Sequence, residues 1–255
     1  MSKLAQGFGI GSSARCKTDP NILQVRESLE EIVTSQTHID LERLYESRCG
    51  PNADYRRAVW SVLVSDFFSR FIAPDAAVLD LGCGYGDFIN AVQARNRLAM
   101  DMNPAARDKL AADVRFFLQD GSEPWNGIPE NYLDIVFTSN FIEHLPDKAA
   151  VARSLLEARR CLKPGGRFIA MGANIKHVAA GLYWDFWDHQ VPFTENSLSE
   201  GLRANGFSID LCVGRFLPYT MASRRRYPLV FVKLYLALPL LWRLFGRQYL
   251  VVARR

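Results

Sequence analysis

The sequence predicts an α/β protein in which helices wind doubly around a mostly parallel sheet. From about residue 74 onward, short apolar runs alternate with amphipathic segments, and a glycine-rich turn follows the first of these runs. Such alternation is typical of parallel sheets with right-handed crossover connections. The 255 residues are enough for one such domain with additional segments around it.

The predicted elements follow from apolar periodicity and from helix-end residues. Helices are expected over 21–47 and 54–72, before the first strand. Asp147 and Thr194 are expected N-caps, and 163–166 (Lys-Pro-Gly-Gly) is expected to be a turn that ends a helix. The expected strands are 76–81, 97–101, 114–118, 132–138, 167–172, 207–213 and 248–253. The helices expected between them are 87–95, 104–112, 147–162 and 195–205.

These elements suggest two regions, an N-terminal arm and helical lid over 1–73 and a domain over 74–255. Within the domain, residues 227–245 are almost wholly apolar, yet two prolines and two basic residues interrupt them. A membrane-spanning helix needs about 20 mostly uncharged apolar residues, so this stretch is too short and too broken to span. We expect an apolar insert over about 215–246, before the last strand.

Charge is distributed unevenly along the chain. Nine of the 31 basic residues lie beyond Asp210, where there is no acid, so residues 1–210 carry a net charge of about −5. A nucleic-acid-binding protein usually has its positive charge near its catalytic body, so no nucleic-acid partner is expected. The basic, apolar stretch 224–247 is a candidate for peripheral membrane contact. The alternative is that it packs on the domain or forms a dimer surface, and the oligomeric state stays open.

Cysteine usage and the N-terminus indicate a cytoplasmic protein. The five cysteines are scattered, without a CxxC pair or a Cys/His cluster, which argues against disulfides and a zinc site. Residues 1–18 are polar and rich in glycine and serine, unlike a signal peptide. We therefore expect a reducing compartment and no metal.

A ligand site is predicted where the first strand ends. Residues 78–88 read Val-Leu-Asp-Leu-Gly-Cys-Gly-Tyr-Gly-Asp-Phe, a buried strand, a turn with Gly82, Gly84 and Gly86, and a helix start. The glycines let the backbone approach a ligand, and free helix-start amides favour a small anionic group. A dinucleotide fingerprint would have its third glycine at Asp87, and no Gly-Lys-Ser/Thr follows as in a triphosphate loop.

Two further acids narrow the choice of ligand. Asp101 ends the next strand, where its two oxygens can accept from both hydroxyls of a ribose. Asp120 ends the third strand and can accept from an exocyclic adenine amine. This set suits S-adenosylmethionine better than NAD, although Asp101 could also serve only to cap the helix starting near Pro104.

Five ordered motifs resemble the class I S-adenosylmethionine-dependent methyltransferases. They are 78–88, Asp101, 118–121, 133–146 and 162–168, and the resemblance extends over about 74–213. It implies a Rossmann-like sheet of seven strands whose last strand is antiparallel. It also implies the cofactor contacts: Asp80 and the Gly82, Cys83, Gly84 and Gly86 turn at the methionine end, Asp101 and Met102 at the ribose, Asp120 and Gly121 at the adenine, and Asn140 and Phe141 beside the sulfonium.

Two histidines are candidate catalytic bases. His144 follows the fourth strand, at the sheet edge where ligands of such folds bind. His189 lies after the fifth strand with Asp185 and Asp188 beside it, which could orient its ring. A purely structural role is the alternative for each.

The expected function is therefore S-adenosylmethionine-dependent methyl transfer in small-molecule biosynthesis, with O-methylation of a sugar, glycolipid or other small molecule as the first hypothesis. The sequence after the fourth strand is Asn-Phe-Ile-Glu, unlike the Asn-Pro-Pro-Tyr that is typical of enzymes acting on nucleobase or glutamine amides. The alternatives are a C- or N-methyltransferase of a quinone or lipid and a non-catalytic S-adenosylmethionine-binding subunit. An NAD oxidoreductase is a more distant alternative.

Overall fold

A computed structural model describes residues 43, 45–46, 52–179, 181–218 and 226–255. Residues 41–255 belong to one compact unit. The predicted arm over 1–18 and nearly all of the predicted helix over 21–47 lie outside the described residues.

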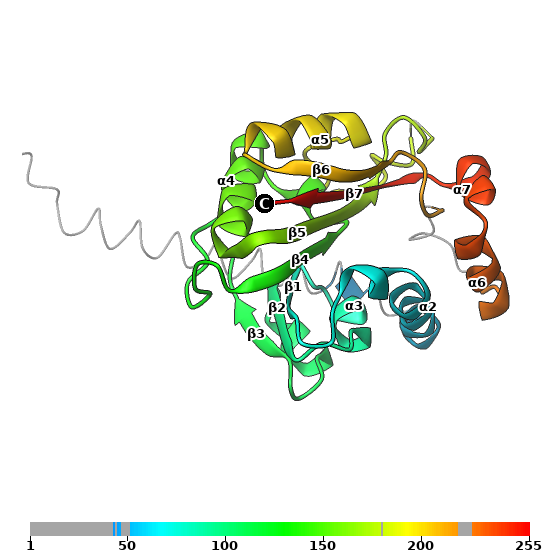
Figure 1. Ribbon diagram of the computed structural model, residues 1–255. Coiled ribbons are helices and arrows are strands. Elements are labelled where there is room, and N and C mark those ends of the chain that lie inside the picture. The colour runs from blue at the N-terminus through cyan, green and yellow to red at the C-terminus, as the bar shows by residue number, and fades with distance from the viewer. Residues whose placement is uncertain (1–42, 44, 47–51, 180, 219–225) are drawn as a thin grey trace, which may run out of the picture. The chain divides into compact units, whose positions relative to one another are not determined.

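The described chain contains a seven-stranded sheet, in the order β3-β2-β1-β4-β5-β7-β6 (Figure 1). Its strands are β1 (Ala77–Leu81), β2 (Asn96–Asp101), β3 (Arg115–Leu118), β4 (Leu133–Ser139), β5 (Leu162–Ala173), β6 (Ser208–Val213) and β7 (Gln248–Arg254). Only β7 is antiparallel to its neighbours, β5 and β6. The predicted doubly wound sheet with an antiparallel last strand is confirmed.

Helices cover both faces of this sheet. The α-helices are α2 (Ala53–Asp66), α3 (Asp87–Ala91), α4 (Lys148–Cys161), α5 (Glu195–Ala204), α6 (Leu229–Ala237) and α7 (Pro239–Phe245). Three short 3-10 helices are η1 (Phe68–Phe71), η2 (Pro104–Lys109) and η3 (Ile142–His144). α3 ends earlier than predicted because the chain turns extended at Val92. η2 replaces the α-helix expected over 104–112, and its cap is Asn103, whose side chain accepts from the Ala105 amide.

Both predicted N-caps are present. The Asp147 carboxylate accepts from the Ala150 amide at 2.7 Å, and the Thr194 hydroxyl accepts from the Ser197 amide at 3.1 Å. Ser197 Oγ accepts from the Thr194 amide in return, which completes a capping box.

The turn expected over 163–166 is instead part of β5, which begins at Leu162 directly after α4. Leu162 pairs with Leu133 of β4, and the register then shifts before Ile135 pairs with Arg167. Gly165 has a φ of 80°, so the extra residues form an irregular, bulge-like stretch. The prediction was wrong because a Pro-Gly-Gly sequence suits a bulged strand end as well as a turn.

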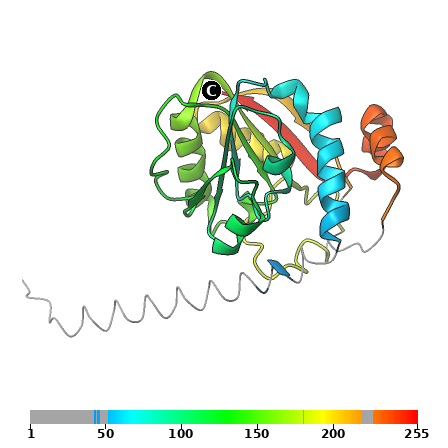
Figure 2. The ribbon, with the colours of Figure 1, turned by 90° about the horizontal axis from the view of Figure 1, so that it is seen from below.

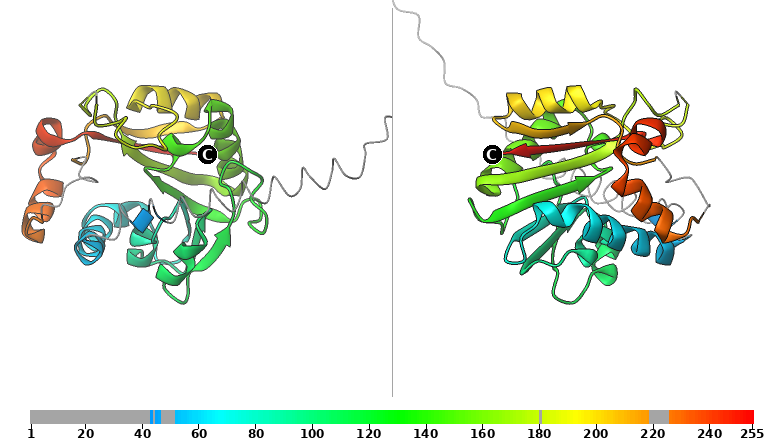
Figure 3. Two further views of the ribbon diagram at one scale, coloured as in Figure 1. Left: turned by 180° about the vertical axis from the view of Figure 1, so that it is seen from behind. Right: turned by 45° about the vertical axis from the view of Figure 1, so that its right-hand side comes forward.

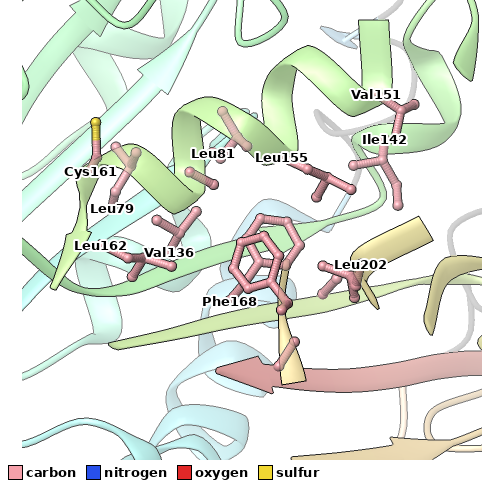
Figure 4. Packing of buried hydrophobic residues seen from close by; sticks show 14 of the residues in the cluster. Leu79, Leu81, Val136, Ile142, Val151, Leu155, Cys161, Leu162, Phe168 and Leu202 are labelled. Carbon is pink, nitrogen blue, oxygen red and sulfur yellow. The ribbon is translucent and has the colours of Figure 1, made fainter. Parts of the chain in front are cut away.

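The core lies on the two faces of the central strands. On one face α4 and α5 pack on the sheet, where Leu81, Val136, Leu155 and Phe168 are buried together (Figure 4). On the other face α2 and α3 pack on it (Figure 2), and the rings of Phe88 and Phe137 stack with centroids 3.6 Å apart. β1 is buried over its whole length, as expected for a central strand covered on both faces.

α6 and α7 lie between β6 and β7 in the chain, where the apolar insert was predicted. α6 lies beside α2 (Figure 3), and the Tyr227 amide donates to the Tyr55 hydroxyl of α2 at 2.9 Å. α2, assigned by the sequence to the lid, thus packs against both α3 and α6 within the same unit.

Candidate functional site

The glycine turn has the backbone conformation that its spacing suggests. Gly82, Gly84 and Gly86 have φ values of 69°, 53° and 74°, a left-handed region that other residues rarely adopt. The amides of Gly82 and Cys83 both donate to the Met100 carbonyl of β2, at 2.9 and 3.1 Å. These two hydrogen bonds attach the turn after β1 to the end of β2.

Gly82 and Gly121 leave room for the Phe141 ring. A Cβ on Gly82 would lie 2.3 Å from Phe141 Cδ2, and one on Gly121 would lie 2.9 Å from Phe141 Cζ. A Cβ on Gly84 would meet nothing closer than Tyr45 Cε1 at 3.5 Å. Gly84 is therefore the glycine of this set that faces open space.

Asp101 holds the turn from the end of β2. Its Oδ2 accepts from the Gly84 amide at 2.8 Å and its Oδ1 from the Asn103 amide at 2.9 Å. Burial raises the pKa of Asp101, and these backbone hydrogen bonds oppose the rise. Each carboxylate oxygen can accept more than one hydrogen bond, so the predicted ribose contact is compatible with these bonds.

A cavity lies beside the turn and connects it with the loop after β5. Its lining comes from Tyr45, α2, β1, the glycine turn, α3, β4, η3 and that loop: Tyr45, Arg56, Trp60, Asp80, Gly82, Cys83, Gly84, Tyr85, Asp87, Phe88, Phe137, Ser139, Asn140, His144 and Asp188. Of the predicted site residues, the cavity thus brings together Asp80, Gly82, Cys83, Gly84, Asn140 and His144.

Acidic groups dominate the end of the cavity at the turn. Asp80 is 3% exposed, and burial together with the charge of Asp101 raises its pKa well above the usual range. Burial, followed by the charges of Asp80 and Asp101, likewise raises the pKa of the Cys83 thiol, which makes it a poor nucleophile. Asp87 pairs with Arg56 of α2. This electrostatic environment favours a ligand that brings a positive charge.

Asp120 and Gly121, predicted to face adenine, do not line this cavity, and neither does Met102, predicted at the ribose. Asp120 Oδ1 accepts from the Ser122 amide and hydroxyl, at 2.8 and 2.9 Å. Met102 is 43% exposed, and Gly121 contacts the Phe141 ring instead of open space. The Phe141 ring thus lies between Gly121 and Gly82 of the turn.

Asn140 stands in a strained position at the end of β4. Its φ is 50°, uncommon for a residue other than glycine. Its Nδ2 donates to Ser139 Oγ at 3.1 Å and Gln248 Oε1 at 3.4 Å, while within the described residues its buried Oδ1 accepts no hydrogen bond. A buried acceptor on the cavity wall is suited to bind a donor from a ligand.

His144 and Asp188 form a pair on the wall of the cavity. His144 Nδ1 lies 3.2 Å from Asp188 Oδ2 and also 3.2 Å from the Asp188 carbonyl oxygen. Burial lowers the pKa of His144, but the bond to Asp188 and the charges of Glu143 and Asp188 outweigh it, so the pKa is raised. The carboxylate expected to orient His189 therefore holds His144.

His189 lies behind this pair, and His144 alone of the two lines the cavity. The His189 ring is 6% exposed, stacks on Phe186 with centroids 5.0 Å apart, and meets the His144 ring edge-on at 4.8 Å. The loop is fixed by the Tyr183 hydroxyl, which donates to the Val191 carbonyl at 3.0 Å.

Glu143 is a site residue that the sequence reasoning did not single out. It is 2% exposed, burial raises its pKa, and within the described residues neither of its carboxylate oxygens has a hydrogen-bond partner. Donor atoms of Glu143, His144 and His189 lie within 4.8 Å of one another, close enough to hold a metal ion. Its position directly before His144 in the sequence was the available signal.

The cavity residues contributed by α2, and two tyrosines that line the cavity with them, were also not predicted from the sequence. Arg56 and Trp60 of α2 line it, together with Tyr45 and Tyr85, whose rings have centroids 6.0 Å apart. The sequence placed this helix in an acceptor lid but gave no residue-level signal, because its apolar spacing resembles that of any packed helix.

Comparisons with known proteins agree with this fold. A family profile described as "Methyltransferase domain" matches residues 53–211. The probable methyltransferase ltbC of Aspergillus luteorubrus is 30% identical over 116 residues, 39% of this chain and 41% of that protein. The match therefore spans less than half of that relative.

Solved structures show the same fold at lower identity. An S-adenosylmethionine-dependent methyltransferase from Archaeoglobus fulgidus has a TM-score of 0.60 and 20% identity, covering 80% of this chain and 97% of that one. A Haloferax volcanii methyltransferase complexed with the Trm112 activator has a TM-score of 0.57 and 17% identity, covering 82% and 93%. S-adenosylmethionine is the expected cofactor. The family profile covers more than half of the chain, which belongs to the methyltransferase domain family.

Proposed function

We propose that this protein transfers a methyl group from S-adenosylmethionine to a hydroxyl group of a sugar, glycolipid or other small molecule. The observation that carries the proposal is the cavity itself, which the acidic glycine turn and the His144–Asp188 pair line together. The scattered cysteines support a cytoplasmic location for this activity.

Charge supports this cofactor over a dinucleotide. S-adenosylmethionine carries positive charge on its sulfonium and amine, and the buried Asp80 and Asp101 carboxylates would be stabilised by it. A pyrophosphate would add negative charge beside these same acids. We assign the methionine end to Asp80 and the turn with Gly82, Cys83, Gly84 and Gly86, the ribose to Asp101 and Met102, the adenine to Asp120 and Gly121, and the sulfonium side to Asn140 and Phe141.

In the reaction, S-adenosylmethionine supplies a methyl group already activated for displacement. The chain aligns the acceptor with it, excludes water and accepts a proton. Asp188 holds Nδ1 of His144, which leaves Nε2 to take the hydroxyl proton as the oxygen attacks. His189 packs on the His144 ring and fixes its orientation.

The experiment is incubation with methyl-labelled S-adenosylmethionine and a panel of hydroxylated small molecules or a cell extract, followed by mass spectrometry of labelled products. We expect S-adenosylhomocysteine and a product labelled on oxygen. Label on carbon or nitrogen of a quinone or lipid would favour the alternative acceptor class. Binding of the cofactor without any S-adenosylhomocysteine would indicate a non-catalytic subunit.

The base is tested by His144→Ala, with His177→Ala as the matched control outside the cavity. His144→Ala is expected to lower turnover about 10²–10⁴-fold while the cofactor still binds. His189→Ala should lower turnover less, through the orientation of His144. Intact turnover in either variant, with cofactor binding retained, would remove that histidine from the mechanism.

A further inference from the structure

An exposed apolar surface, which we term the insert face, covers α6, α7 and the residues flanking them. Its large side chains are about half exposed or more: Tyr227 (51%), Val230 (64%), Phe231 (57%), Leu234 (49%), Leu238 (44%), Leu240 (67%), Leu244 (62%) and Phe245 (59%). Monomeric proteins rarely expose so many large apolar groups together, and such patches mark interaction sites.

The insert face is not needed to hold the helices on the domain. That is done by the opposite side of the segment, where Leu236 is buried and Trp242 meets Phe67 and Phe216 edge-on, with centroids 5.7 and 5.0 Å apart. The Tyr235 hydroxyl also donates to the Phe216 carbonyl at 2.6 Å. The segment is thus anchored on one side and apolar on the other.

Basic residues surround the insert face. Arg226, Lys233, Arg243 and Arg247 are all exposed, and no acid occurs after Asp210 in the sequence. Lys233 is paired with Asp66 of α2, at 3.9 Å, whereas among the described residues Arg226, Arg243 and Arg247 form no ion pair with an acid. This combination of apolar and basic groups is complementary to a layer whose interior is apolar and whose outer side is negatively charged.

The helices are suited to lie in a membrane surface and not to cross it. α6 has nine residues and α7 has seven. At 1.5 Å per residue each is about 10–14 Å long, against about 30 Å of bilayer hydrocarbon. Among the described residues, no helix combines the length and apolar character needed for a span.

We propose that the insert face docks this protein on the surface of an anionic membrane. The apolar side chains enter the region between headgroups and acyl chains, and the four bases contact anionic headgroups. The adjoining helix α2 carries Arg56 and Trp60 of the cavity wall, so docking brings that cavity close to the bilayer. This inference does not depend on the proposed methyl transfer.

A second copy of the chain is a poorer occupant. A symmetric dimer would place the same face of both copies together, and therefore bring the bases of one copy to those of the other. An anionic lipid surface removes this repulsion and covers the same apolar area.

The test is co-sedimentation of the full chain with vesicles of phosphatidylcholine alone and with added phosphatidylglycerol. We expect binding to the anionic vesicles that weakens as salt is raised. Leu244→Ser should weaken the binding about tenfold. Leu156→Ser of α4, a leucine of similar exposure (53%) on another helix, should leave it unchanged.

A charge variant, Lys233→Gln with Arg243→Gln and Arg247→Gln, keeps the apolar face and should lose the preference for anionic vesicles. Circular dichroism and thermal unfolding check that each variant is folded, as expected for exposed side chains. Equal binding by Leu244→Ser and Leu156→Ser would overturn the proposal. The proposal would also be overturned if the parent chain bound no vesicles and formed a dimer in analytical ultracentrifugation that Leu244→Ser dissociates.

Discussion

Gly82→Ala is expected to destabilise the protein strongly because of the Phe141 ring. The added Cβ would lie 2.3–2.6 Å from three atoms of Phe141, and Gly82 has a φ of 69°. A non-glycine residue in this conformation costs about 1–2 kcal/mol. Displacing a packed ring adds about 1–3 kcal/mol.

Gly165→Ala is the matched control for this change. Gly165 has a φ of 80°, yet nothing lies within 4 Å of the position its Cβ would occupy. It should therefore show the cost of the backbone conformation without the clash. The two variants should differ by about 1–3 kcal/mol, or about 2–12 °C in Tm for a domain of this size.

The assay is thermal and urea unfolding of the two variants and the parent chain. Phe141→Ala in the Gly82→Ala background should recover part of the loss, since the clashing ring is removed. If Gly82→Ala and Gly165→Ala destabilise the chain equally, the close packing of Gly82 on Phe141 is refuted.

Three further results are expected. Asp101→Asn should lower S-adenosylmethionine affinity about 10–100-fold in calorimetry, because hydrogen bonds to a charged acceptor are worth about 1.5–3 kcal/mol; unchanged affinity would refute its ribose role. Asp188→Asn removes the partner that raises the pKa of His144 above its ordinary value of 6.5. The acid limb of the turnover–pH profile, where His144 is protonated, should therefore move to lower pH. An unmoved limb would exclude His144 as the base. Chelators should leave turnover unchanged, whereas a loss restored by Zn²⁺ would show that Glu143, His144 and His189 hold a metal.

The strands and the glycine turn were predictable because their signals are local. The apolar run 78–81 marks a strand buried on both faces, and the alternate glycines mark three left-handed positions. The N-caps at Asp147 and Thr194 were recognised for the same reason, since a cap and its amide lie three residues apart. The irregular start of β5 was missed because its register depends on pairing with β4.

The sequence by itself thus determined the sheet, the turn after β1 and the class of cofactor, and its family resemblance implied the antiparallel last strand. Only the tertiary structure decided which histidine lines the cavity, since Asp188 could reach His144 only once the loop after β5 folded over the end of β4. It also decided that the insert face is exposed, because composition gives the apolar content of α6 and α7 but not the side that packs on the domain. Periodicity and backbone preference are encoded within a few residues, whereas such pairings depend on the path of the whole chain.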